Sequence, residues 1–142
     1  MTQQLAGHCH CGSVRVILEP SKATAELPLR ACQCSFCRAH GALSTSDPEG
    51  TLQFSCSAPE SVQRYRFGTG SADFLVCREC GVYLGAQTMR EGRRFGILNT
   101  LTLDPIPEAL PEAAPMSYAN EASEARYARR QARWTPLAGD SV

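Results

Sequence analysis

Apolar and polar residues alternate in short runs before residue 104, and glycine, proline and serine separate these runs. The clearest run is "SVRVILE" at 13–19, where Val14, Val16 and Leu18 lie on one face of an extended chain. Turn-forming segments lie between the runs, with "DPEG" at 47–50 before the run at 52–54 and "GTGS" at 68–71 before the run at 73–77. The pattern predicts a mainly β domain, with further strands at 52–54, 62–67, 73–77, 82–87 and 94–103.

The pattern changes after residue 104. Residues 105–116 contain Pro105, Pro107, Pro111 and Pro115, which restrict the backbone and remove hydrogen-bond donors. We therefore expect a proline-rich, extended linker without regular structure.

The tail, residues 117–142, is expected to be helical over 117–134, with Ser117 as N-cap. Acidic residues early in this segment and arginines late in it suit the helix dipole. A thin apolar stripe of alanines would pack on the domain or on a second copy of the chain, which makes a homo-oligomer one option. The charged side chains are then expected to form a solvated face, with a functional basic surface as the alternative: Arg126, Arg129, Arg130 and Arg133.

Length and charge narrow the class of protein. The chain has 142 residues, of which 43% are hydrophobic and 20% charged, as expected for one globular domain. Fourteen basic residues balance fourteen acidic ones, which argues against a general nucleic-acid binder. Without a signal-like start or a membrane-spanning apolar run, the protein is expected to be cytoplasmic, where thiols stay reduced.

The cysteines carry the candidate chemistry. Seven of the eight lie in three short clusters, and Cys56 stands alone. In the first and last clusters a glycine, Gly12 or Gly81, follows the second cysteine and permits the sharp turn of a metal-binding knuckle. These two clusters predict a closed, structural zinc site with four thiolate ligands: Cys9, Cys11, Cys77 and Cys80.

The middle cluster leaves three cysteines, Cys32, Cys34 and Cys37, in six positions. Three protein ligands and one open position are typical of catalytic zinc, so we expect an open second site here. Closure by His40 or Cys56 is the alternative, and it would make both sites structural. His10 is expected to point away from its cysteine neighbours, because side chains alternate along an extended segment.

The three clusters, in this order, resemble those of the glutathione-dependent formaldehyde-activating enzyme (GFA) family, which includes centromere protein V. The matching segments are "CHCGSV" at 9–14, "CQCSFCRAHGA" at 32–42 and "FLVCRECGV" at 74–82, within a match over about 5–105. Each motif is weak alone, but together and in order they are specific. The resemblance implies a small twisted β-tent fold, so residues 1–104 would form a GFA-like zinc-binding β domain.

The resemblance also implies two zinc ions per chain, a structural one in the outer clusters and a catalytic one in the middle cluster. The implied activity is that of a carbon–sulfur lyase, with glutathione and formaldehyde forming S-hydroxymethylglutathione. Because zinc deprotonates a bound thiol, the middle site would deliver a thiolate to a carbonyl carbon. A non-catalytic zinc module that binds protein or nucleic acid is the alternative.

A glutathione-like thiol carries carboxylates that need cationic partners. Arg38 follows the third cysteine of the middle cluster directly, and we expect it to contact a substrate carboxylate. More distant candidates for this role are Arg30, Arg64, Arg66 and Arg78.

Overall fold

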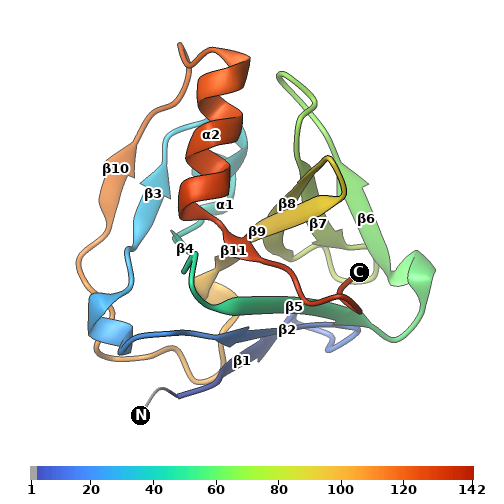
Figure 1. The fold of residues 1–142 in the computed structure, drawn as a ribbon. Coiled ribbons are helices and arrows are strands. Elements are labelled where there is room, and N and C mark those ends of the chain that lie inside the picture. Colours follow the sequence, from blue (N-terminus) through green and yellow to red (C-terminus); the bar gives the residue numbers. More distant parts are fainter. Residues whose placement is uncertain (1–2) are drawn as a thin grey trace.

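The computed structural model describes residues 3–142, so the first two residues of the predicted 1–104 domain lie outside the described part. A small antiparallel sheet contains β1 (Leu5–His8), β2 (Val14–Glu19) and β5 (Thr51–Cys56), with β2 in the middle. In Figure 1 this sheet lies across the bottom of the molecule. Its central strand places Val14 opposite Cys56 and Val16 opposite Phe54.

A larger sheet rises from the small one on both sides (Figure 1). Its strands run in the order β10-β3-β4-β9-β8-β7-β6, and β11 pairs with β9. All these pairs are antiparallel except β10 with β3. In chain order the strands are β3 (Arg30–Cys32), β4 (Ser44–Thr45), β6 (Val62–Tyr65), β7 (Asp73–Cys77), β8 (Tyr83–Arg90), β9 (Arg93–Asn99), β10 (Ala114–Met116) and β11 (Thr135–Pro136).

The main apolar core lies between the two sheets. Val14, Val16 and Leu18 of β2 are buried and pack in one cluster with Leu75 of β7 and Leu84 of β8. Alternate residues of β2 face this core while their neighbours face outward, as the sequence pattern predicts. The two open sheets and their shared core confirm the mainly β, tent-like class.

Two helices complete the described fold. Helix α1 (Ser35–His40) follows β3 and ends at Gly41, whose positive φ of 60° lets its N–H bond the carbonyl of Arg38. Helix α2 (Ser123–Arg133) lies in front of the large sheet in Figure 1. Three 3-10 turns occur at Thr24–Glu26, Pro59–Ser61 and Thr100–Thr102. None of the described helices is long and apolar enough to cross a membrane.

The expected strands are confirmed with small shifts at their ends. The segment 73–77 is β7, residue for residue, and 13–19 differs from β2 by one residue. The last expected strand, 94–103, is too long, because β9 ends at Asn99 and a 3-10 turn follows. The side chain of Asn99 accepts a hydrogen bond from the N–H of Leu101 and so begins that turn. The pattern missed the short elements β1, β3, β4, β11 and α1.

The C-terminal segment is more regular and more tightly packed than its sequence predicts. Residues 114–116 form β10, although 105–116 was expected to lack regular structure. Pro115 is tolerated because β10 is the outermost strand of its sheet. Helix α2 begins at Ser123 with Ala122 as N-cap, so the expected capping role of Ser117 is wrong. The division of the chain at residue 104 stays a prediction.

The alanine stripe is not the face of α2 that turns toward the domain. The alanines at positions 122, 125, 128 and 132 are exposed, so their expected packing on the domain is wrong, and packing on a second copy of the chain stays a prediction. Arg130 is buried instead, and Arg126 and Arg129 are half-buried, while Arg133 is exposed. Trp134, just after the helix, is buried in an apolar cluster with Ala86 and Phe95. The expected solvated arginine face is therefore wrong for three of the four residues.

Candidate metal centres

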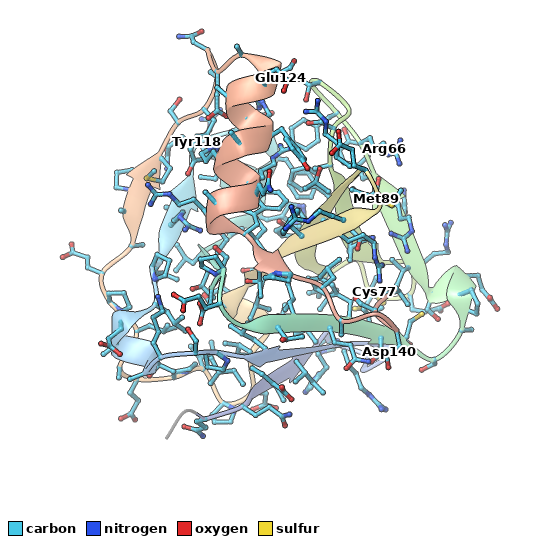
Figure 2. All side chains as sticks on the ribbon, in the orientation of Figure 1. Arg66, Cys77, Met89, Tyr118, Glu124 and Asp140 are labelled. Carbon is cyan, nitrogen blue, oxygen red and sulfur yellow. The ribbon has the colours of Figure 1, made fainter. Side chains whose placement is uncertain are left out.

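The outer cysteine clusters meet at the junction of the two sheets. Cys9 and Cys11 follow β1 of the small sheet, whereas Cys77 ends β7 of the large sheet and Cys80 lies in the turn after it. Figure 2 labels Cys77 near the right-hand end of β5. The four Sγ atoms lie within 4.8 Å of one another.

The spacing of these thiols matches a tetrahedral zinc site. The Sγ atom of Cys11 lies 3.7 Å from that of Cys9 and 3.6 Å from that of Cys77. A zinc–sulfur bond of about 2.3 Å gives a tetrahedron edge of about 3.8 Å between sulfurs. The residues of this cluster therefore fit a closed Zn²⁺ site.

Both knuckles have the backbone geometry that the glycines predict. Gly12 and Gly81 have φ values of 84° and 80°, in the left-handed region. Their N–H groups donate to the carbonyls of Cys9 and Cys77, at 3.1 and 2.8 Å. The turn also directs the N–H of Val14 at Cys9 Sγ, 3.3 Å away. Such N–H groups stabilise negative charge on sulfur.

The thiols of this cluster differ in acidity. A hydrogen bond with the Ser13 hydroxyl lowers the pKa of Cys11 to about 6. Burial raises the pKa of Cys77 to about 12. A cation bound among the sulfurs would favour the deprotonated form of all four thiols.

The middle cluster is built by β3 and the first turn of α1. Cys32 ends β3, Cys34 is the N-cap of α1, and Cys37 lies in the helix. Their Sγ atoms lie within 4.8 Å of one another, and the N–H of Cys37 donates to Cys34 Sγ at 3.3 Å. A hydrogen bond between the thiols of Cys32 and Cys37 lowers the pKa of Cys32 to about 5 and raises the pKa of Cys37.

No fourth ligand joins this cluster among residues 3–142, since no His, Cys, Asp or Glu has a ligand atom within the same distance of all three sulfurs. His40 packs against aromatic rings, with centroids 4.5 Å from Phe36 and 5.6 Å from Tyr83. Cys56 is partly buried and packs against the core between the sheets. Among the described residues, these three thiols are the ones placed to hold a metal ion here.

A buried hydroxyl beside the middle cluster was not anticipated from the sequence. Tyr83 is only 2% exposed and packs in one apolar cluster with Cys37. Its hydroxyl has no hydrogen-bond partner among the described residues. Burial, together with the three nearby thiols, raises its pKa well above the usual value. The hydroxyl is therefore a protonated donor without an acceptor in the described structure.

The middle cluster opens on a cavity of about 310 Å³, of the size that holds a small molecule. Cys32 and Cys34 lie in its wall. Phe67 and Phe74 supply an aromatic part of the wall, where their rings pack at an angle of 44° with centroids 4.7 Å apart. The segment 117–119 and α2 also contribute to the wall.

The predicted substrate contact, Arg38, lies outside the wall of this cavity. It is exposed, and its Nε donates to the carbonyl of Gln33 at 3.1 Å. Arg64 and Arg66 pair with Asp73, and Arg78 bonds the carbonyl of Glu60. The arginines that do line the cavity are Arg30, Arg126, Arg129 and Arg130.

Comparison with known proteins identifies the family. The sequence model described as glutathione-dependent formaldehyde-activating enzyme matches residues 4–120. The chain belongs to the GFA family. The match extends past residue 105, where the resemblance was expected to end, and it stops before α2. A comparison with curated protein sequences finds no match.

A solved structure is similar to this chain over most of its length. It is the crystal structure of a protein from Rhodobacter sphaeroides, a structural genomics target, with 32% sequence identity and a TM-score of 0.61. The alignment covers 78% of this chain and 99% of the Rhodobacter protein. The GFA assignment and the two cysteine clusters agree with a zinc-binding protein of this family.

Proposed function

We propose that the protein is a zinc-dependent carbon–sulfur lyase that acts on the adduct of a small thiol and an aldehyde. Glutathione and formaldehyde, which together give S-hydroxymethylglutathione, are the proposed pair, as the family description suggests. The observation that carries the proposal is the middle cluster, in which three thiols without a fourth grouped ligand lie beside a cavity.

The cysteines, the metal ion and the cavity walls have different roles in the proposed site. Cys32, Cys34 and Cys37 would hold the ion, and zinc, when bound, supplies a cationic centre that favours the thiolate form of a substrate thiol. In the addition, a carbon–sulfur bond forms, the carbonyl π electrons move to oxygen, and the thiol proton ends on that oxygen. The lyase direction breaks the same bond and returns the proton to sulfur. The cavity walls would contact the thiol and orient it.

The outer clusters have a structural role in this proposal. Four thiolates close the coordination sphere, so Cys9, Cys11, Cys77 and Cys80 leave no position for a substrate. The chain would then bind two zinc ions with separate roles. We place the reaction in the cytoplasm, because all eight cysteines are free and both clusters need reduced thiols.

The alternative of a nucleic-acid or protein-binding zinc module rested on the basic run 126–134. Three of its arginines turn toward the domain, and only Arg133 is exposed. This orientation favours a small-molecule site over a basic docking surface.

The test follows adduct formation between glutathione and formaldehyde by NMR exchange, with the zinc-loaded protein at catalytic concentration. We expect acceleration by the wild-type protein and its loss in Cys34→Ser. Cys56→Ser is the matched control, because this cysteine belongs to neither cluster, and it should retain the wild-type rate. An equal rate with and without wild-type protein would remove the formaldehyde reaction from the proposal.

A further inference from the structure

The cavity beside the middle cluster has a strongly cationic wall. Four guanidinium groups line it, one from β3 and three from α2: Arg30, Arg126, Arg129 and Arg130. No aspartate or glutamate belongs to the described lining of this cavity. Like charges this close repel one another, so their arrangement costs free energy unless an anion is bound.

Only one carboxylate pairs with these arginines in the described structure. Glu121 accepts from Arg129 at 2.9 Å through Nε and at 3.0 Å through Nη2, and it lies 3.8 Å from Nε of Arg126. Arg30 bonds the Ser46 hydroxyl at 2.9 Å instead of an acid. The four arginines and Glu121 together give this part of the cavity wall a net charge of +3.

Arg130 is the most deeply placed of the four. Its side chain belongs to a residue only 8% exposed, and its Nη1 bonds the Ser71 hydroxyl at 2.8 Å. Its Nε is buried and has no hydrogen-bond partner among residues 3–142. Burial and the neighbouring Arg129 and Arg126 lower the pKa of Arg130 to about 10. A buried guanidinium with an unused donor is typical of a site that binds an anion.

The cationic wall is held in place rather than free in solvent. The guanidinium carbon of Arg129 lies 3.6 Å from the ring centroid of Tyr118, which Figure 2 labels beside α2. That of Arg130 lies 4.9 Å from the ring of Trp134. Stacking fixes the direction of the planar groups, which lowers the entropy cost of binding a carboxylate.

From this arrangement we propose that the arginines of α2, with Arg30, form an anion subsite for a carboxylate of the thiol substrate. The substrate sulfur would then lie toward Cys32 and Cys34, which share the same cavity. The inference rests on the proposed function and narrows its substrate class to small thiols that carry a carboxylate. Because α2 lies beyond residues 4–120, its three arginines lie outside the part matched to the family, whereas Arg30 lies within it.

The test measures binding to the zinc-loaded full chain by calorimetry at low ionic strength. Three probes are used: glutathione, S-methylglutathione, whose sulfur is blocked, and glutathione diethyl ester, whose carboxylates are neutralised. We expect glutathione to bind more tightly than its diester by about tenfold or more, since charge-assisted bonds to arginine are lost in the ester. S-methylglutathione should also bind, and added salt should weaken its binding.

Variants locate the subsite. Arg129→Gln is expected to weaken S-methylglutathione binding by about tenfold and to leave binding of the diester unchanged. Arg133→Gln is the matched control on the same helix, since Arg133 is exposed and does not line the cavity. Arg30→Gln, on β3, tests the same subsite should the α2 variant fail to fold.

Equal affinity for glutathione and its diester would overturn the inference, as would equal losses in Arg129→Gln and Arg133→Gln. A loss in Arg38→Gln alone would assign the carboxylate to the exposed arginine of α1 and overturn it too. The two proposals fail separately. If S-methylglutathione binding depends on charge but no lyase reaction is found, the anion subsite is supported and the proposed reaction is removed. If the reaction occurs but does not depend on the charge of the substrate, the reaction is supported and the anion subsite is removed.

Discussion

The Sγ atoms of Cys11 and Cys77 lie 3.6 Å apart, although 66 positions separate the two residues in the chain. Cys11 follows β1 of the small sheet, and Cys77 ends β7 of the large one. A metal ion among these thiols therefore joins the two sheets at one edge of their shared core. The middle cluster joins only β3 to the adjacent α1 and has no such long-range role.

This difference predicts unequal effects of cysteine substitution. We expect Cys80→Ser to lose one zinc ion and to lower the melting temperature by on the order of 10 °C or more, because a structural zinc contributes folding energy directly. Cys34→Ser should also lose one zinc ion but unfold near the wild-type temperature. Metal analysis and thermal unfolding of the two variants check this expectation. Similar melting temperatures for both would show that the centres share one role.

Removal of the Tyr83 hydroxyl should lower the activity without lowering the stability of the fold. The hydroxyl is buried beside the middle cluster and has no partner in the described structure, so Tyr83→Phe removes an unsatisfied group. We expect the free energy of unfolding to stay the same or to rise by about 1 kcal/mol. If the hydroxyl donates to a ligand at the metal centre, the lyase rate falls, by about tenfold. A less stable variant with an unchanged rate would contradict both parts of this prediction.

Asp47 should make part of the stability depend on pH. The carboxylate is fully buried, and although burial raises its pKa, hydrogen bonds from Ser21 and Glu49 outweigh this and lower it overall. The N–H of Ser21 donates to Oδ2 at 2.6 Å, and that of Glu49 donates to Oδ1 at 3.0 Å. Because the pKa of Asp47 is lower in the folded state, the ionised carboxylate stabilises the fold. This stabilisation is complete above the ordinary pKa of 3.8 and is lost as the pH falls through the pKa of the folded state.

Asp47→Asn should therefore cost about 1–3 kcal/mol of stability at neutral pH. The difference in free energy of unfolding between wild type and variant, measured with denaturant at each pH, should be constant from about pH 6 to about pH 8. It should shrink below about pH 4. Asp140→Asn is the control, because Asp140 is exposed. A difference that grows toward acid would contradict the assignment.

Gly85 should tolerate no larger side chain. A Cβ there would lie 2.7 Å from Cζ of Phe54 and would also meet the carbonyl of Ile97. Since β8 and the small sheet cannot move apart without opening the core, Gly85→Ala is expected to lower the free energy of unfolding by about 1–3 kcal/mol. Gly139→Ala, where no atom lies within 4 Å of the added Cβ, should change it by less than about 0.5 kcal/mol. Comparable losses would refute the packing explanation.

Local features were predictable wherever neighbouring residues decide the structure. Alternation identified β2, and the glycine after a cysteine pair anticipated the positive φ of Gly12 and Gly81. Spacing also anticipated the division of seven cysteines into a group of four and a group of three. Short strands such as β3 and β4 were not predicted, because two or three residues are too few to show an alternating pattern. These residues are extended only because they pair with distant strands.

The sequence by itself determined the mainly β class, the two thiol clusters and the family, since each depends on local pattern or on spacing. Tertiary structure alone decided which face of α2 turns inward. An alanine stripe and an arginine run predict a solvated basic face, yet Arg130 is buried and Trp134 anchors the end of the helix. The reason is that a helix orients by the surface it meets, and here that surface offers the hydroxyl and the carbonyl of Ser71 to the guanidinium of Arg130.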